Sequence, residues 1–424
     1  MQQRDQLIEN DEKKRLVSNI FSLGFLQATT YILPLLTVPY LVRVLGPEYF
    51  GLLAFATATI SYFALLTDYG FNLSATRQIS IHRSNVDKLS EIFSAVIILK
   101  IILMVISFIL MSLVVLSFDK FSEHWEVFLI TYGLVLGQTI FPVWLFQGME
   151  SMKHITFFNI IAKGFFAACI FIFVHEQNDY LLVPLFTSMG FILVGIWSFY
   201  LAKSKFNVVF SWQSTSVLKH QLVEGWYVFI STIAISLYTI STTFILGLFT
   251  NNMVVGYYSA ADKIVHAVKG IYVPVSRAIY PVISIKVSKN KSDTIKFLRK
   301  FALMAGAGMF AISAIQYHLA DLIVKIIMGD QYEPSILLLK IMAFLPFLVA
   351  LSNIFGIQTM LNLGFQKSFS VLVFIGASVG MLLALVLVPI YGAVGAAVGL
   401  LITEALVTVM LGLFVLLKVR KEFL

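Results

Sequence analysis

Six cationic side chains interrupt apolar stretches that are long enough to cross a bilayer. They are Lys100, Lys163, Lys263, Lys269, Arg277 and Lys340. Placing one cation in hydrocarbon costs at least ~2.5–3.5 kcal/mol on insertion scales, so six of them are not expected without a reason. They indicate a positively charged path through a membrane protein, and such a path would accept an anion.

The stretch 254–285 holds the densest group of these charges. Four charged or titratable side chains share one face of it: Asp262, His266, Lys269 and Arg277. On a helix that turns about 100° per residue they span an arc of about 80°, with Lys263 at its border. This face either lines an aqueous cavity or pairs with neighbouring helices, because intramembrane charges also form structural pairs. The cations outnumber the single acid, which favours the cavity.

Further charged groups are candidates for the same cavity. Lys100 and Lys163 lie near mid-depth of two N-terminal spans. Each of them either lines the cavity or pairs with an acid, for which Asp68 and Glu404 are the candidates. Four acids could couple transport to an ion or pair with a cation: Asp68, Glu224, Asp262 and Glu404. Lys340 is near the outer end of its span, and we expect its ammonium to reach the interface.

The composition indicates the elements that must position these groups. The chain has 424 residues, of which 59% are hydrophobic and 12% charged, whereas soluble domains carry roughly 25% charged residues. At ~20 apolar residues per span, this length accommodates about a dozen helices and little else. The single cysteine, Cys169, allows no disulfide or thiolate metal site within one chain. We expect an all-α polytopic membrane protein.

The cations outside the spans are distributed unevenly between alternate loops. Twenty-one lie in the two termini and in every second loop, whereas the opposite loops hold only Arg43, Lys120 and Lys325. Cytoplasmic loops are enriched in Lys and Arg, so both termini are predicted in the cytoplasm, which requires an even number of spans. Hydropathy windows of ~19 residues give twelve spans, with ten or fourteen as alternatives. Residues 1–15 are polar and indicate a tail rather than a cleavable signal peptide.

Two loop segments resemble each other at a constant offset of 205 residues. Residues 46–56 read GPEYFGLLAFA and residues 251–261 read NNMVVGYYSAA. With the even span count they predict two six-helix halves of the same orientation, related by an axis along the membrane normal, with a site between them. The predicted division is a cytoplasmic tail (1–16), an N-lobe (17–205), a cytoplasmic linker (206–221), a C-lobe (222–417) and a cytoplasmic tail (418–424).

Sequence motifs for enzyme chemistry are absent. The chain has no HExxH helix, Walker loop, dinucleotide fingerprint or serine-elbow motif. The longest predicted outer loop, about 317–334, is short for a membrane polymerase or ligase. We therefore expect a transporter and not an enzyme, with a polysaccharide polymerase or ligase as the weaker alternative. No metal or organic cofactor is predicted.

Several segments resemble one family. Residues 39–51 read PYLVRVLGPEYFG, residues 68–77 read DYGFNLSATR and residues 144–150 read WLFQGME. The later run 392–397 reads GAVGAA. These segments are similar to Wzx-type O-antigen and polysaccharide flippases of the multidrug/oligosaccharidyl-lipid/polysaccharide (MOP) superfamily. The resemblance covers the whole chain and is most specific in its first 150 residues.

The resemblance implies twelve transmembrane helices in two pseudo-symmetric six-helix lobes, with a MATE-like fold and alternating access. It implies an undecaprenyl-diphosphate-linked oligosaccharide as the substrate, moved from the cytoplasmic to the periplasmic leaflet of the bacterial inner membrane. The implied protein partners are the O-antigen polymerase and the chain-length machinery. No nucleic-acid partner is expected. Cavity cations would offset desolvation of the diphosphate; the candidates are Lys263, Lys269, Arg277, Lys100 and Lys163. Coupling to H+ or Na+ through the four acids is a hypothesis.

The main alternative is a MATE-like small-molecule exporter of the same superfamily. A cavity for cationic drugs would be acidic or aromatic, so the excess of cations disfavours this alternative. A peptidoglycan-precursor flippase would usually have two further helices. A major facilitator carrier would have a longer central loop.

Overall fold

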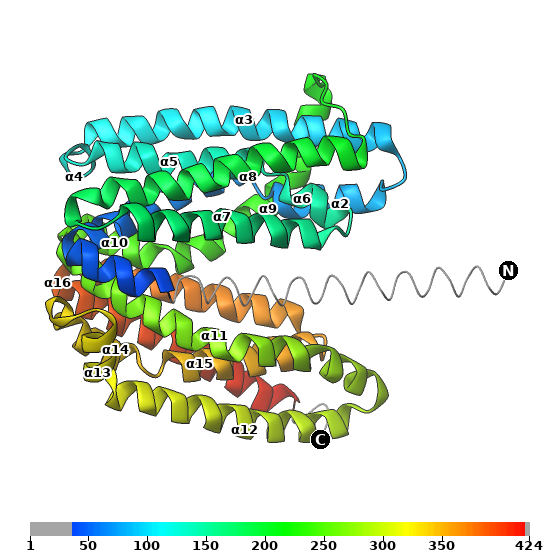
Figure 1. Cartoon of the computed structure of the whole chain (residues 1–424). Coiled ribbons are helices and arrows are strands. Elements are labelled where there is room, and N and C mark those ends of the chain that lie inside the picture. The colour runs from blue at the N-terminus through cyan, green and yellow to red at the C-terminus, as the bar shows by residue number, and fades with distance from the viewer. Residues whose placement is uncertain (1–35, 420–424) are drawn as a thin grey trace. The chain divides into compact units, whose positions relative to one another are not determined.

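A computed structural model gives the structure of residues 36–419, without the side chains of residues 234–235, 237–239, 288, 291–292 and 419. The predicted N-terminal tail, most of the first predicted span and most of the C-terminal tail lie outside the described residues. Within the described range every assigned element is a helix (Figure 1). The all-α prediction is therefore confirmed for this range.

Between residues 36 and 419, eight helical stretches are long and apolar enough to cross a membrane. Two of them are far longer than the ~20 residues that one span needs: Leu36–Ile81 has 46 residues and Gln366–Lys418 has 53. Glycines with positive φ interrupt both, at Gly46 (φ 70°) and at Gly392 (φ 55°, ψ −131°). Each long stretch therefore contains more than one helix. The chain is an integral membrane protein with multiple spans.

The chain divides into two compact units by its internal contacts. Unit 1 contains Ala56–Ile233 and unit 2 contains Val38–Phe55 together with Ala234–Leu424. The helices of unit 1 follow the segment 56–68 and are α2 (Phe71–Ile81), α3 (Val86–Ser117), α4 (Asp119–Ser122), α5 (Trp125–Ile140), α6 (Val143–Gly148), α7 (Met152–Phe173), η1 (Gln177–Leu181), α8 (Leu182–Phe206) and most of α9 (Thr215–Thr239).

Unit 2 contains the remaining helices, several of which are broken into shorter pieces. They are α10 (Ser241–Phe249), α11 (Asn252–Lys289), α12 (Lys291–His318), α13 (Ala320–Ile327), η2 (Asp330–Tyr332), α14 (Pro334–Met342), α15 (Leu345–Asn353), the π-helical η3 (Ile354–Leu361), α16 (Gln366–Phe414) and η4 (Val415–Val419). α11 has 38 residues and is also long enough to span a bilayer.

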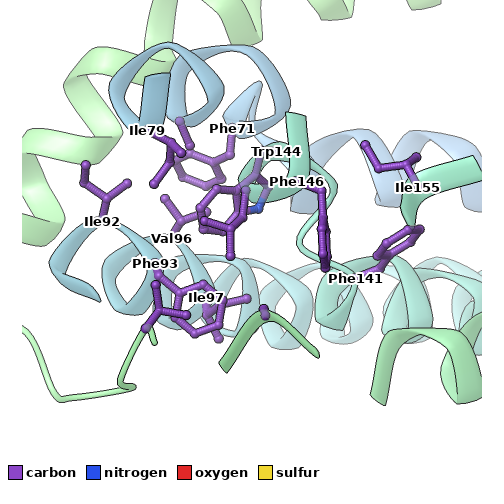
Figure 2. Packing of buried hydrophobic residues seen from close by; sticks show 14 of the residues in the cluster. Phe71, Ile79, Ile92, Phe93, Val96, Ile97, Phe141, Trp144, Phe146 and Ile155 are labelled. Atoms are coloured by element: carbon purple, nitrogen blue, oxygen red, sulfur yellow. The ribbon is translucent and has the colours of Figure 1, made fainter. Parts of the chain in front are cut away.

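In unit 1, α3, α5, α7 and α8 run side by side (Figure 1). Small residues let α5 and α8 approach closely, because a Cβ on Gly137 would lie 2.5 Å from the carbonyl carbon of Phe191. Large aromatic side chains fill the space where α2, α3 and α6 meet, including Phe71, Phe93 and Trp144 (Figure 2). This core fixes the end of α6 and the turn that follows it.

The N-terminal part of α9 belongs to unit 1 because it packs against α2. Gln78 and Gln221 exchange two amide hydrogen bonds of 2.8 Å each. The rings of Tyr69 and Phe229 stack with centroids 4.5 Å apart. Gly70, which has a positive φ of 76°, leaves room for Val228 at this contact. The polar and aromatic pairs together hold α9 in one rotation about its axis.

Residues 38–55 pack against the start of α11 within unit 2. A Cβ on Gly51 would lie 1.8 Å from the carbonyl oxygen of Asn252, and a Cβ on Gly256 would lie 1.9 Å from that of Pro47. The two contacts are reciprocal, since Gly256 and Asn252 follow Gly51 and Pro47 by the same 205 residues. The backbones of the two similar loop segments therefore touch each other directly, which any side chain at these glycines would prevent.

Two polar side chains secure the same segment. Arg43 donates from Nε to the carbonyl oxygen of Ile327 at 3.2 Å and from a terminal nitrogen to that of Ile326. Gln331 donates from Nε2 to the carbonyl oxygens of Val42 and Arg43, at 3.3 and 3.1 Å. Carbonyls in the last turn of a helix lack partners inside the helix. Arg43 therefore supplies donors to the last turn of α13. Gln331 supplies donors to the helical turn that precedes the break at Gly46.

Candidate functional site

α11 presents one charged stripe along its length in unit 2. Asp262 and Lys269 are half-buried, whereas Lys263, His266 and Arg277 are exposed. His266 Nε2 lies 3.5 Å from Asp262 Oδ2, and the imidazole side chain is 61% exposed. The helix continues through Pro274 and Pro281 to Lys289. The structure thus places the predicted stripe on one continuous helix.

The cations of this stripe have no acid partner among the described residues. No described carboxylate oxygen lies within 4.0 Å of a side-chain nitrogen of Lys263, Lys269 or Arg277. Asp262 is close to His266 instead. The stripe therefore carries net positive charge, and donors of this kind form strong charge-assisted hydrogen bonds with phosphate oxygens. Chemically it can hold a multiply charged anion.

A buried polar network beside the stripe on α11 fixes the direction of the stripe. Asn353 Oδ1 accepts from Ser276 Oγ at 2.8 Å and from the hydroxyl of Tyr272 at 3.4 Å. Gln358 Nε2 donates to the carbonyl oxygen of Ser276 at 2.9 Å. Ser276 and Gln358 are buried, so these bonds are costly to break. They hold α11 against α15 and the π-helix η3 in one rotation.

Sequence reasoning did not find this network. Asn353 and Gln358 are five residues apart, which on an α-helix would separate them by about 140°. The π-helical turns that begin at Ile354 bring both amides to one side, where Gln358 Nε2 lies 3.4 Å from Asn353 Oδ1. Two polar residues five positions apart are compatible with a π-helix, but many such pairs occur in α-helices, so this spacing alone does not predict one.

Lys100 in unit 1 has a different environment. Its ammonium lies 3.3 Å from Asp68 Oδ1 and 3.4 Å from the carbonyl oxygen of Gln138. Asn72 Nδ2 donates to the same Asp68 oxygen at 2.8 Å. The Lys100 side chain is only 4% exposed. Of the two alternatives for Lys100, the structure shows the pairing with Asp68.

The other predicted site residues are dispersed. Lys163 on α7 is half-buried, as is Glu404 on α16. Glu224 is exposed on α9. Lys340, which lies within the apolar stretch Pro334–Leu361, pairs with Asp321 at 2.7 Å, and this hydrogen bond lowers the pKa of the Asp321 carboxyl.

A small polar void lies between α10 and the two halves of α16. Ser241, Thr242 and Thr403 contribute hydroxyl groups to its lining, and Glu404 is the next residue along α16. Among the described residues, no three His, Cys, Asp or Glu side chains are grouped so that they could hold a metal ion.

The chain is similar to one family of known proteins. The model of the family described as "Polysaccharide biosynthesis protein" matches residues 16–287. A protein of Escherichia coli K12 named "Putative O-antigen transporter" is 36% identical over 406 residues, which is 96% of this chain and 98% of that protein. A protein of Shigella dysenteriae with the same name is 31% identical over 391 residues, covering 92% and 97%.

Solved structures share the fold at low sequence identity. An inward-facing multidrug resistance MATE family transporter of the MOP superfamily superposes with a TM-score of 0.72 at 14% identity, covering 95% of this chain and 98% of that one. The lipid II flippase MurJ in an inward closed conformation superposes with a TM-score of 0.67 at 12% identity, covering 94% and 87%. The chain therefore belongs to the Wzx-type polysaccharide biosynthesis protein family, and it is a membrane transporter rather than an enzyme.

Proposed function

We propose that this protein is a flippase for lipid-linked oligosaccharides. It moves undecaprenyl-diphosphate-linked O-antigen or similar polysaccharide repeat units from the cytoplasmic to the periplasmic leaflet of the bacterial inner membrane. The observation that carries the proposal is the α11 stripe, with three cations that no described carboxylate neutralises. The names of the E. coli and Shigella relatives support O-antigen units as the cargo.

The chemistry of the substrate fits the stripe. A diphosphate carries about two negative charges, and Lys and Arg side chains in a water-filled cavity of low dielectric offset the cost of removing it from bulk water. Lys269 and Arg277 are the principal groups in this role, with Lys263 beside them; Lys163 is a further candidate. The polyprenyl chain stays in lipid, so only the sugar and diphosphate cross the cavity.

The proposed architecture is twelve helices in two pseudo-symmetric six-helix lobes, the N-lobe over 17–205 and the C-lobe over 222–417, joined by the linker 206–221. The breaks at Gly46 and Gly392 and the reciprocal contact of Gly51 and Gly256 support this count and this symmetry. Both termini lie in the cytoplasm, and the two lobes expose the cavity alternately to each side of the membrane.

Ion coupling completes the cycle. An inside-negative potential favours outward movement of an anion by ~2.3 kcal/mol per charge per 100 mV. The same potential opposes return of the empty, cationic cavity. Binding of H+ or Na+ at an acid would remove this opposition, and Glu224 and Glu404 are candidate acids for this role. Asp262 is the third candidate because it adjoins the stripe.

The test measures lipid-linked repeat units in each leaflet of a deletion strain that carries variants of this chain. Lys269→Ala and Arg277→Ala should trap single repeat units in the cytoplasmic leaflet while the protein level stays normal. Lys340→Ala is the matched control, because this cation also interrupts an apolar stretch but is paired with Asp321. Wild-type export by both stripe variants would remove the proposed role, and repeat units that cross without polymerising would indicate a polymerase instead.

The topology has its own test. In a Cys169→Ala background, a cysteine introduced between residues 286 and 296 should react with an impermeant reagent only after the inner membrane is opened. Labelling from the periplasm would contradict the proposed orientation of α11 and α12.

A further inference from the structure

A second group of cations lies in unit 1, at the turn between α6 and α7 and at the end of α8. Lys205 Nζ is 3.2 Å from His154 Nε2 and 3.4 Å from Ser151 Oγ. Lys153 is close enough to act electrostatically on both Lys205 and His154. Lys153 and Lys205 are exposed, whereas Ser151 and His154 are half-buried. We call these four residues the turn cluster.

The turn cluster has no acid to neutralise it among the described residues. No described carboxylate oxygen lies within 4.0 Å of the Lys153 or Lys205 ammonium. Glu150 is the nearest acid in the sequence, but it pairs with Arg83 at 2.8 Å. Arg83 Nε also donates to the carbonyl oxygen of Gly148 at 2.7 Å, which holds this pair at the turn. The cost of placing two ammonium groups together is therefore not offset by a described carboxylate.

Neighbouring aromatic rings hold the cluster in place. The His154 ring stacks on Phe146 at an interplanar angle of 21°, with centroids 5.9 Å apart. Lys205 Nζ lies 5.4 Å from the centroid of the Phe206 ring. Phe146 is fully buried in the aromatic core. The imidazole therefore has a fixed plane, and Lys205 has a fixed direction.

The hydrogen bonds leave donors free on one side. Lys205 Nζ lies 3.4 Å from His154 Nδ1 and 3.2 Å from Nε2. One nitrogen of a neutral imidazole accepts, so the ring takes one hydrogen of the ammonium. Ser151 Oγ accepts a second hydrogen of the same ammonium. One hydrogen of Lys205, the three of Lys153 and the Ser151 hydroxyl, whose bond to the Met149 carbonyl oxygen is long at 3.5 Å, remain for a ligand.

We propose that the turn cluster binds a phosphoryl group. Two ammonium groups and a hydroxyl match the several acceptor oxygens and the negative charge of a phosphate mono- or diester. The ligand is either the headgroup of an anionic phospholipid or free inorganic phosphate. The cluster lies at one end of the apolar helices α7 and α8, where a lipid headgroup would be within reach. This site is separate from the α11 stripe and does not depend on the transported substrate.

The experiment compares variants of the full-length detergent-solubilised chain by native mass spectrometry during titration with phosphatidylglycerol, and with phosphatidylcholine as the zwitterionic control. Lys205→Ala should weaken phosphatidylglycerol binding about tenfold, the loss expected for one charge-assisted hydrogen bond. Lys203→Ala is the matched control, because Lys203 is exposed in the same last turn of α8 but makes no contact with the cluster. It should change binding less than about threefold, and Lys205→Arg should restore it.

Calorimetric titration with inorganic phosphate identifies the source of the ligand. Phosphate binding that depends on Lys205, with no preference for phosphatidylglycerol, assigns the site to free phosphate. A Lys205-dependent preference for phosphatidylglycerol assigns it to the lipid headgroup. Equal effects of Lys203→Ala and Lys205→Ala on both ligands, or no effect of either, would overturn the proposal, because the charge would then act only as part of the general surface. If Lys205→Ala does not fold, Ser151→Ala and Lys153→Ala provide the same comparison.

Discussion

Lys100 in unit 1 and Lys269 in unit 2 both place a cation inside a membrane-spanning protein, but their surroundings differ. Lys100 is buried, and its ammonium approaches the Asp68 carboxylate and the Gln138 carbonyl oxygen. No described carboxylate oxygen lies within 4.0 Å of the Lys269 ammonium on the α11 stripe. The Lys100 charge is paired with a carboxylate inside the protein, whereas the Lys269 charge is available to a ligand. The same residue type is therefore structural in one unit and a candidate for binding in the other.

The largest expected effect comes from removing the buried partner in unit 1. Lys100→Met should leave the half-buried Asp68 carboxylate without its cation and destabilise the fold by ~1–3 kcal/mol, because a partly desolvated charge loses its partner. Thermal unfolding in detergent measures this loss. The double variant Lys100→Met with Asp68→Asn should recover most of it. A normal melting temperature for Lys100→Met would show that the pair is not structural and would remove the contrast between the two lysines.

Replacing the lysine of the α11 stripe by methionine should affect export and not stability. Lys269→Met should leave the melting temperature unchanged but reduce export about tenfold, as expected when one charge-assisted contact to a phosphate is lost. Leaflet-resolved measurement of lipid-linked repeat units gives the export, and Lys269→Arg should retain most of it. A clear loss of stability in Lys269→Met would assign this lysine to the structural class as well.

A third variant tests the link between buried polar contacts and the stripe. Asn353→Leu removes the oxygen that accepts from Tyr272 and Ser276. It should destabilise the protein by about 1–3 kcal/mol, since buried donors lose their acceptor. Export should fall with stability, because α11 is no longer held in one rotation. Asn178→Leu, at an exposed position on η1, is the control. An Asn353→Leu protein with normal export would show that the stripe does not need this network.

The smallest effect is expected where the ion pair is exposed. The Lys340 ammonium lowers the pKa of Asp321 in the folded state, so the pair stabilises the protein above the unfolded pKa of the carboxyl. This stabilisation is lost as the pH falls through the lowered folded pKa. Asp321→Asn should therefore lower the melting temperature slightly at pH 7 and not at all at strongly acidic pH. A difference that persists after the carboxyl is protonated would exclude the ion pair as its cause.

Much of this arrangement follows from sequence periodicity. Residues 262, 266, 269 and 277 share a face on any α-helix, so the stripe needed only the knowledge that 254–285 is helical. The apolar runs likewise predicted an all-helical membrane protein. The glycines at the two loop segments were visible as a repeat, although their contact was not. These features depend on local geometry and composition.

The pairings could not be predicted, because they join residues far apart in the sequence. Lys100 had two acids as candidate partners, and only the packing of α3 against the end of the 56–68 helix selects Asp68. The Asn353–Gln358 contact required a π-helix, which a hydrophobic pattern does not reveal. The candidate site is therefore predictable as a surface but not as a set of contacts.

The close contact at Gly51 and Gly256 restricts which substitutions this protein can accept during evolution. The atoms that a new Cβ would strike are main-chain atoms: the oxygens of Asn252 and Pro47. No exchange of side chain at the opposing position can move them, so neither glycine has a compensating substitution at its partner. Suppressors of a Gly256→Ala defect should therefore map to residues that shift a whole helix. The sequences of the two similar segments could diverge at other positions, but Gly51 and Gly256 would both have to be retained.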